Sequence, residues 1–360
     1  MNKMDRVYHF KGSPKEIGFA MGRALGARLE QNVSRYIERR PTRPGALDMD
    51  ALCTGAMPWL RSLPRRFQDE FEGMAEGANL SLQRIAEWAF VEQCVQDGCS
   101  GFVCLLDGHA WVGRNNDTFV PEMWGYVTIR EVDGRIPAIS FGMEGDVFTP
   151  TGINRERLWL HYHYLPAQDA PRPDKPHLPG YVLLVEALET CTTIGDVEAL
   201  LCEMDRDDGM MLFAVDGKSD EFAILECTCT THVRRTTAST ATEKWLVGTN
   251  HYCACGIEMQ DEDSERRYNR LEELVRALYN CGGSLNLPAD LIGILADDAI
   301  ERRGANLSSA NSGGANSGGA NFGTAYANVA CPSRGAMWYT FGGFPAASHG
   351  DWQCVEWPWR

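Results

Sequence analysis

The sequence predicts a layered α+β fold in which sheets stack on one another and helices cover the outside. Three observations support this fold class. Helical patterns occupy the first quarter of the chain, strand patterns begin just after Cys99, and a pair of helices separates those strands from a second group. The chain has 360 residues and is 44% hydrophobic, so it can bury a large core in one big or two ordinary domains.

The N-terminal part of the chain is expected to be helical. The expected helices cover residues 14–39, 64–77 and 81–95. Ser13, Pro14 and Glu16 form a capping box with proline in the first helical position, which marks the start of the first helix. Glycine recurs every four residues along that helix, at Gly18, Gly22 and Gly26. Such a stripe lets another element approach the backbone closely, so we expect tight packing there.

The chain after Cys99 is expected to form strands, with a helical pair in the middle. Asp-Gly turns at residues 107–108 and 133–134 separate the first strands. The expected strands are residues 102–106, 110–113, 126–131, 138–143, 211–216, 221–230 and 245–249. A proline-rich linker over residues 166–179 precedes the expected helices, which cover residues 181–190, 194–204 and 264–280.

Composition excludes several classes of partner. The 49 acidic residues outnumber the 34 basic ones, and the formal net charge of −15 repels phosphate backbones and anionic membrane surfaces. We therefore expect no nucleic acid and no membrane as partner. A cytoplasmic location is expected because the chain has no apolar run of 18 residues and no apolar stretch of signal-peptide length near its start. The 13 cysteines are then expected to be reduced.

Three pairs of residues, two of cysteines and one of histidines, raise the question of a metal site. They are Cys227 with Cys229, Cys253 with Cys255, and His161 with His163. The four thiolates could in principle hold zinc, but metal-binding cysteines more often have two residues between them, and no third ligand accompanies the histidines. Alternation along a strand places each pair on one sheet face, where packing explains it. We therefore expect no metal and no cofactor.

Two further segments are assigned no chemistry. Residues 305–320 contain the repeat Ala-Asn-Ser-Gly-Gly, which predicts a flexible surface loop. Near the C-terminus Trp352, Trp357 and Trp359 are expected to pack against other residues, with the lining of an apolar substrate pocket as the alternative.

The junction between Gly98 and Cys99 is the strongest candidate for chemistry. If the peptide bond between them were cut, Cys99 would carry both a thiol nucleophile and a free α-amine, which titrates near neutrality and can act as its base. A hairpin around the Asp-Gly turn at 107–108 would bring Arg114 and Asp117 back beside Cys99. The alternative is a small buried cysteine beside a salt bridge at a strand end.

Five motifs occur in the order in which they are found in one family of enzymes. They are Gly12-Ser13-Pro14-Lys15-Glu16-Ile17-Gly18 with Gly22, then Asp97-Gly98-Cys99-Ser100, Gly113-Arg114-Asn115-Asn116-Asp117, Gly248-Thr249-Asn250-His251 and Ser264-Glu265-Arg266-Arg267-Tyr268-Asn269-Arg270. Together they resemble the isopenicillin N acyltransferase-like family of N-terminal nucleophile hydrolases. The choloylglycine and penicillin V hydrolases are more distant relatives of that family.

The resemblance implies a four-layer αββα sandwich made as a precursor that cuts itself before Cys99. Residues 1–98 would form a helical N-terminal chain and residues 99–360 the catalytic domain, and the two chains would stay associated. Cys99 would be the nucleophile, Asp117 would orient its amine, and Arg114 would favour its thiolate. Asn250 would donate to the developing oxyanion, and Arg267 would support the site electrostatically.

This sequence also departs from the family's pattern. Asp117 is followed by Thr118 and Phe119 where an aromatic residue commonly comes first, and Asn116 occupies a position where an apolar residue is expected. These departures concern the shape of the pocket and not the nucleophile.

The resemblance implies an amidohydrolase that cleaves a linear amide of a small-molecule substrate through a thioester on Cys99. Acyl transfer is the alternative, with an amine in place of water as acceptor or a coenzyme A thioester as donor. Both reactions pass through the same acyl-enzyme, so the catalytic residues do not separate them. A non-catalytic binding module of the same fold is a second alternative, which the presence of every candidate catalytic residue type disfavours.

Overall fold

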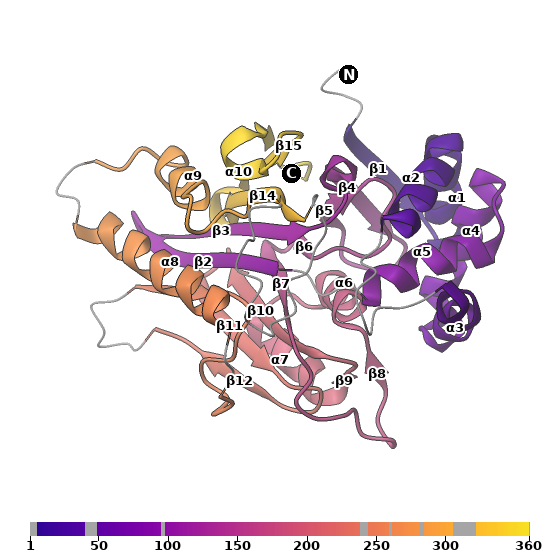
Figure 1. Cartoon of the computed structure of the whole chain (residues 1–360), viewed down its shortest axis with the longest axis horizontal. Coiled ribbons are helices and arrows are strands. Elements are labelled where there is room, and N and C mark those ends of the chain that lie inside the picture. The colour runs from indigo at the N-terminus through magenta and orange to yellow at the C-terminus, as the bar shows by residue number, and fades with distance from the viewer. Residues whose placement is uncertain are drawn as a thin grey trace.

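Two stacked β-sheets form the centre of the molecule, and helices cover their outer faces (Figure 1). The computed structural model describes residues 6–39, 49–94, 98–237, 244–258, 261–280, 284–304 and 322–359. The expected four-layer αββα arrangement is confirmed. A hydrophobic core that draws side chains from both sheets fills the space between them, and a second core lies between the smaller sheet and its helices.

The larger sheet has its strands in the order β1-β4-β5-β6-β7-β10-β11-β12. They are β1 (Val7–Gly12), β4 (Trp124–Val132), β5 (Ala138–Met143), β6 (Thr151–Asn154), β7 (Leu158–Leu165), β10 (Gly209–Asp216), β11 (Glu221–Cys227) and β12 (His232–Arg235). Strand β1 is parallel to β4, and the other neighbouring pairs are antiparallel. The N-terminal segment therefore supplies one edge of this sheet.

The smaller sheet is antiparallel and has its strands in the order β13-β2-β3-β14-β15-β16. They are β13 (Trp245–Gly248), β2 (Gly98–Leu106), β3 (His109–Thr118), β14 (Gly323–Cys331), β15 (Ala336–Phe341) and β16 (Asp351–Val355). Strands β8 (His177–Leu178) and β9 (Asp205–Arg206) form a separate short parallel pair. Strand β2 thus has β13 on one side and β3 on the other.

Helices cover the two outer faces and one end of the sandwich (Figure 1). The larger sheet is covered by α6 (Gly180–Thr190) and α7 (Ile194–Glu203), and the smaller by α8 (Glu262–Asn280), α9 (Ala289–Leu295) and α10 (Ala346–His349). A bundle near β1 contains α1 (Pro14–Leu25), α2 (Ala27–Glu38), α3 (Met49–Ser62), α4 (Arg65–Ala78) and α5 (Leu82–Cys94). Helix α5 leads toward β2, which begins at Gly98.

The predicted glycine stripe packs as expected at two of its three positions. Helices α1 and α4 approach so closely that a Cβ on Gly18 would lie 1.9 Å from the carbonyl oxygen of Glu70, and one on Gly22 would lie 2.2 Å from that of Met74. Gly26 has a different role, because its φ of +52° ends α1. The single helix expected over residues 14–39 is therefore wrong, and two helices meet at Gly26.

Several other expected boundaries also change in the structure. Strand β2 begins at Gly98 and not at residue 102, and β11 ends at Cys227 and not at residue 230. Elements that the sequence pattern did not indicate are β1, α3, β6, β8, β9, β12, α9, α10 and the strands β14 to β16. Trp352 lies on β16, while Trp357 and Trp359 are partly buried against the core between the sheets. The loop expected at residues 305–320 lies outside the described residues.

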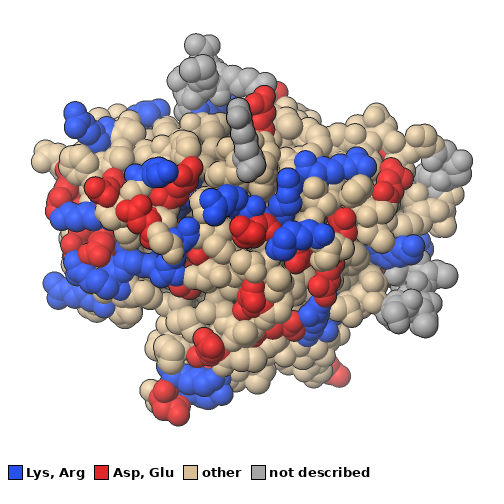
Figure 2. Space-filling view, turned by 180° about the vertical axis from the view of Figure 1, so that it is seen from behind, with Lys and Arg blue, Asp and Glu red and all other residues tan. Residues whose placement is uncertain are grey.

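The charge distribution on the surface and the character of the helices can be compared with the expectation of no nucleic acid and no membrane as partner. On the face shown in Figure 2, basic and acidic residues are interspersed, so the excess negative charge forms no single-sign patch there. Within the described parts of the chain, no helix combines the length and the apolar character that a membrane crossing needs.

Candidate active site

The β2–β3 hairpin brings three of the predicted site residues together. Asp107 and Gly108 both have positive φ, of 52° and 77°, which is the backbone of a tight two-residue hairpin turn. The resulting register pairs Gly98 with Asp117, Cys99 with Asn116, and Gly101 with Arg114. Because directly paired residues lie on the same face of a sheet, Cys99, Asn116 and Arg114 all face the larger sheet.

The thiol of Cys99 lies in a fully buried polar environment. Its Sγ atom is 3.3 Å from Nη2 of Arg114, 3.7 Å from Oδ1 of Asn116 and 3.8 Å from the carbonyl oxygen of Tyr162 on β7. The chain is continuous from Gly98 to Cys99, so these are the contacts of the uncut polypeptide. The guanidinium is the one charged group among these neighbours, and it favours the thiolate.

Arg114 is fully buried and has no carboxylate within ion-pair distance in the described residues. Its guanidinium donates instead to neutral oxygens, namely the carbonyl of Pro150, Oγ1 of Thr151 and Oδ1 of Asn116. Burial lowers the pKa of Arg114, but the Tyr326 hydroxyl and the Cys99 thiol outweigh burial and raise it. A buried cation without a carboxylate is stabilised by an anion, and the thiolate of Cys99 is in the position to supply one.

Asn250 and Arg267 bind the backbone of Cys99 from the side of β13. Oδ1 of Asn250 accepts from the backbone N–H of Cys99 at 2.9 Å and from Nη2 of Arg267 at 3.1 Å. Arg267, on α8, also donates to the carbonyl oxygen of Cys99 and to Oγ of Ser100. The side-chain Nδ2 of Asn250 donates to the carbonyl of Tyr164 at 3.0 Å. One proton of that amide remains for another acceptor.

The first turns of α8 hold Asn250 in place. Ser264 Oγ accepts from the backbone N–H of Asn250 at 2.8 Å and lies 2.8 Å from both Nδ1 of His251 and Oγ1 of Thr249. Three residues further along the same helix, Arg267 binds the side chain of Asn250. The helix therefore fixes both the backbone and the amide of this residue.

A chain of charges connects Asp117 to Arg267 through two residues that the sequence reasoning missed. Asp117 lies opposite Gly98, where its Oδ1 accepts from Oγ1 of Thr324 at 2.7 Å and its Oδ2 is 3.5 Å from Nε of Arg302. Arg302 pairs in turn with Asp263, and Asp263 accepts from Nε of Arg267 at 3.0 Å. The two arginines outweigh the effect of burial and hold the pKa of Asp263 well below its usual range.

These groups leave an excess of positive charge around Cys99. Among the described residues, Arg267, Arg302 and the more exposed Arg266 pair with the carboxylates of Asp117 and Asp263, and Arg114 has no carboxylate partner, so positive charges outnumber negative ones. The remaining positive charge favours an anion at Cys99 and disfavours a further cation beside it.

One of the two missed residues had a signal in the sequence. Asp263 precedes Arg267 by four residues, which is the spacing of an ion pair on one helix face. Arg302 had none, because it follows α9 in a loop and reaches Asp117 only through the tertiary fold.

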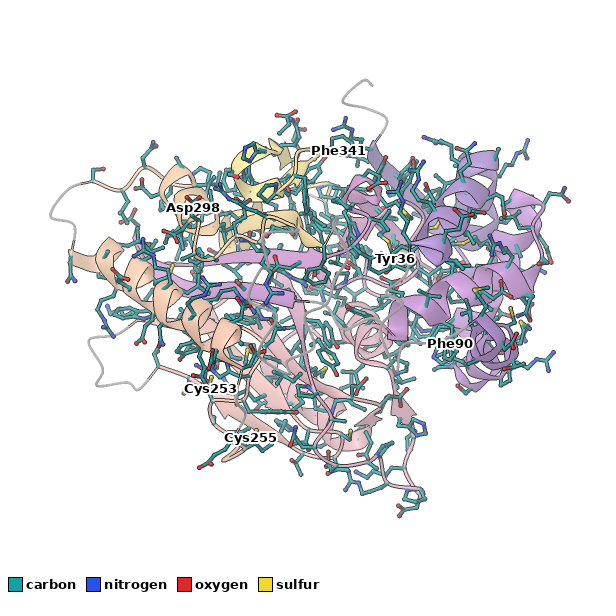
Figure 3. All side chains as sticks on the ribbon, viewed as in Figure 1. Tyr36, Phe90, Cys253, Cys255, Asp298 and Phe341 are labelled. Atoms are coloured by element: carbon teal, nitrogen blue, oxygen red, sulfur yellow. The ribbon has the colours of Figure 1, made fainter. Side chains whose placement is uncertain are left out.

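The residues considered for metal binding lie in two different places. Cys253 and Cys255 lie beside β11 (Figure 3), where Glu226 accepts from the backbone N–H of Cys253 at 2.9 Å. His161 and His163 are fully buried between the sheets with their rings stacked 5.1 Å apart. In the described parts of the chain, no group of three or more histidine, cysteine, aspartate or glutamate side chains has an arrangement that could hold a metal ion.

Comparison with known proteins gives likenesses of structure. No protein-family model matches the chain. A variant of the conjugated bile acid hydrolase of Clostridium perfringens has 13% identity and a TM-score of 0.48, with 72% of this chain and 96% of that chain covered. Penicillin V acylase of Agrobacterium tumefaciens has 13% identity and a TM-score of 0.47, with 72% of this chain and 86% of that chain covered.

An N-acylethanolamine-hydrolyzing acid amidase ortholog of Caenorhabditis elegans has 13% identity and a TM-score of 0.45, covering 65% of this chain and 93% of that chain. These are likenesses of structure at 13% identity. The resemblance to the isopenicillin N acyltransferase-like family stays a prediction, and so do the roles of the individual site residues.

Proposed function

We propose that this chain is a self-cleaving cysteine amidohydrolase whose nucleophile is Cys99. The observation that carries the proposal is the buried thiol 3.3 Å from Arg114, a guanidinium with no carboxylate partner among the described residues. A structural cysteine needs no such neighbour, because burial of a neutral thiol among apolar side chains is sufficient. The arrangement instead stabilises the charged form that attacks carbonyl carbon.

The first reaction would be the cut itself. The thiolate of Cys99 attacks the carbonyl carbon of Gly98, the bond between that carbon and the nitrogen of Cys99 breaks, and the nitrogen takes up a proton to become a free amine. The Gly98 acyl group is then held as a thioester on Cys99. Water attacks the thioester, and the products are the carboxylate of Gly98 and the regenerated thiol. After the cut, Cys99 is the first residue of the second chain.

The second reaction would repeat this chemistry on an external amide. The neutral α-amine takes the thiol proton as sulfur attacks the substrate carbonyl, and it then gives that proton to the leaving nitrogen as the carbon–nitrogen bond breaks. Water hydrolyses the acyl thioester to a carboxylic acid. Asn250 would hold the α-amine through Oδ1 and would donate its remaining amide proton to the oxyanion, and Arg267 would fix both.

The experiment is a substrate panel read against matched cysteine variants. N-acyl amino acids, β-lactams and acylated amines are incubated with wild type, Cys99→Ala and Cys104→Ala. Cys104 is the control because it lies on the same strand, fully buried, in the core on the opposite face of the sheet. We expect wild type and Cys104→Ala to cleave the same substrates and Cys99→Ala to cleave none.

Hydroxylamine tests for the acyl-thioester intermediate, and analysis of the products shows whether the acyl group goes to water or to an amine. An acyl thioester reacts with hydroxylamine to give a hydroxamate, so hydroxamate should appear with wild type and be absent with Cys99→Ala. If the carboxylic acid is the main product when no amine is added, the enzyme is a hydrolase. If millimolar amine is added and more amide forms than acid, the enzyme is instead an acyltransferase. Turnover that survives in Cys99→Ala would contradict the proposal.

A further inference from the structure

The side chain of Asn116 has a buried donor without an acceptor next to the nucleophile. Its Oδ1 accepts from Nη2 of Arg114 at 2.5 Å and is 3.7 Å from Sγ of Cys99. Its Nδ2 is fully buried and has no hydrogen-bond partner among the described residues. A guanidinium has donors only, so it must face the oxygen of the amide, and this fixes the direction of Nδ2.

An unpartnered buried amide destabilises a folded protein unless some other molecule accepts from it. Leaving such a donor unsatisfied carries the full cost of removing it from water. An apolar side chain of similar volume would pack at this position without that cost, and the sequence motif leads us to expect one there. The position beside Sγ indicates that the missing acceptor belongs to the substrate.

The positions of Asn250 and Asn116 on either side of Cys99 indicate which part of the substrate supplies the acceptor. Asn250 binds the nitrogen of Cys99 from the side of β13, whereas Asn116 lies on β3 at the other side of β2. In the proposed reaction, the leaving nitrogen and the oxyanion must lie near the α-amine and Asn250. The remaining substituent of the carbonyl carbon is the acyl chain, and it is therefore the part that faces Asn116.

We infer that Asn116 selects acyl groups that have a hydrogen-bond acceptor close to the scissile carbonyl, such as an ether, hydroxyl or keto oxygen. This inference rests on the proposed function and adds a substrate class to it. A purely aliphatic chain leaves Nδ2 unsatisfied after water has been excluded, so the site discriminates against it. Asn116 thus acts in specificity, through a direct contact with the acyl chain.

The test compares amides that differ by one oxygen. Methoxyacetyl and butanoyl amides form one pair, and 3-methoxypropanoyl and pentanoyl amides form a second, each built on the amine that wild type releases fastest in the panel. For each pair, kcat/KM for the ether amide is divided by kcat/KM for the aliphatic amide. This ratio is then divided by the ratio of their rates of hydrolysis by hydroxide, which removes the inductive effect of the oxygen and gives the corrected ratio. For at least one pair we expect wild type to prefer the ether by about tenfold, which is the size of one hydrogen bond.

Variants assign that preference to Asn116. Asn116→Leu removes the donor with little change in volume, and Asn116→Asp keeps an acceptor for Arg114 while removing the donor. In each of them the corrected ratio should fall to about one or below. Asn115→Ala is the matched control, since Asn115 lies on the opposite face of β3 and donates to the carbonyl of Leu295 at 2.8 Å. Its ratio should equal that of wild type.

Each outcome bears on the inference or on the proposed function separately. A corrected ratio near one in wild type for both pairs overturns the inference without any variant, even if the variants fail to fold or to self-cleave. An equal loss for ether and aliphatic substrates in Asn116→Leu also overturns it and places Asn116 at the oxyanion or in support of Arg114. If wild type cleaves no ether amide although it releases the same amine in the panel, the inference also fails, whereas turnover of both substrates by Cys99→Ala contradicts the proposed function instead.

Discussion

Gly98 is constrained by its neighbours as well as by the chemistry of the proposed cut. A Cβ added there would lie 3.0 Å from Nη1 of Arg302 and 3.2 Å from the Cβ of Asp117. Either the guanidinium or the strand backbone would then have to move. The absence of a side chain thus allows the charged residues to approach the peptide bond that joins Gly98 to Cys99.

At this position we predict that Gly98→Ala slows self-cleavage at least about tenfold, because a shift of a few tenths of an ångström misaligns the attacking groups. The uncut fraction is followed by intact mass over time after synthesis. Gly195→Ala is the control, since Gly195 lies on α7 with only Oγ1 of Thr193 near its Cβ position, at 3.7 Å. Equal cleavage rates in both variants would show that the close approach at Gly98 has no role.

Local sequence could predict the residues of the site that lie in short motifs. The Asp-Gly turn predicts the hairpin, and the hairpin places Arg114, Asn116 and Asp117 beside Gly98 and Cys99. The contact between Asp117 and Arg302 could not be predicted, because it depends on how the loop after α9 returns to the end of β3. Nor could any local pattern show that Asn116 has an orphan donor, since that depends on every neighbour at once.

Helix α8 is the element that organises the site. Within two turns it presents Asp263, Ser264 and Arg267 to Asn250, to Arg302 and to the backbone of Cys99. The sequence predicts this helix because its apolar positions recur with helical spacing, and its observed start at Glu262 lies two residues before the expected one. Its function as a support depends on β13 and β2, which only the fold brings next to it.

At this element we predict that Asp263→Asn destabilises the protein by about 3–5 kcal/mol, because it leaves Arg267 and Arg302 facing each other without their shared carboxylate. Self-cleavage should slow as well, since Arg267 binds the carbonyl of Cys99. Urea unfolding measures the first effect and intact mass the second.

The control for this change is Asp298→Asn. Asp298 pairs with Arg303 at the surface, where its side chain is 80% exposed (Figure 3). Surface pairs of this kind contribute about 0–1 kcal/mol, so this variant should behave as wild type. If Asp263→Asn were also as stable as wild type, the ion pairs that connect Asp117 to Arg267 would not contribute to the stability of the protein.

The interface between the two sheets joins the site to the stability of the whole molecule. His161 and His163 are fully buried in it, and a Cβ on Gly101 would lie 3.1 Å from Nε2 of both. Nδ1 of His161 accepts from Nε1 of Trp159, and Nδ1 of His163 lies 3.1 Å from the carbonyl of Thr249. Burial, together with the positive charge of Arg114, lowers the pKa of both histidines well below the usual value.

The whole protein should therefore lose stability in mild acid. Below about pH 6.5 the unfolded chain binds protons on these histidines that the folded protein does not bind, so the free energy of unfolding falls as the pH falls. The slope is about 1.4 kcal/mol per pH unit for each histidine until its folded pKa is reached. We predict a decline from pH 7 to pH 5 in urea unfolding of the uncut Cys99→Ala chain.

Replacing both histidines by glutamine in that chain should flatten the decline over the same pH range. The exposed His9, whose side chain is 52% accessible, provides the control, and His9→Gln should leave the decline unchanged. If the double variant and its parent lose stability in parallel, the buried imidazoles are not the source of the acid sensitivity.

The N-terminal segment should remain bound after the cut. Its strand β1 completes the edge of the larger sheet against β4, and the buried Glu70 on α4 pairs with Arg130 of β4 at 2.7 Å. We predict that the two fragments elute together in gel filtration and separate only in denaturant. Separation in native buffer would mean that the cut also changes the fold.

The central claim is that Cys99 becomes a chain terminus that carries both nucleophile and base. The most direct measurement is intact mass with N-terminal sequencing of active wild-type protein, alongside Cys99→Ala. We predict two fragments in the wild type, the second beginning at Cys99, and one intact chain without activity in the variant. A fully active wild-type protein in which Cys99 is still joined to Gly98 would contradict the account.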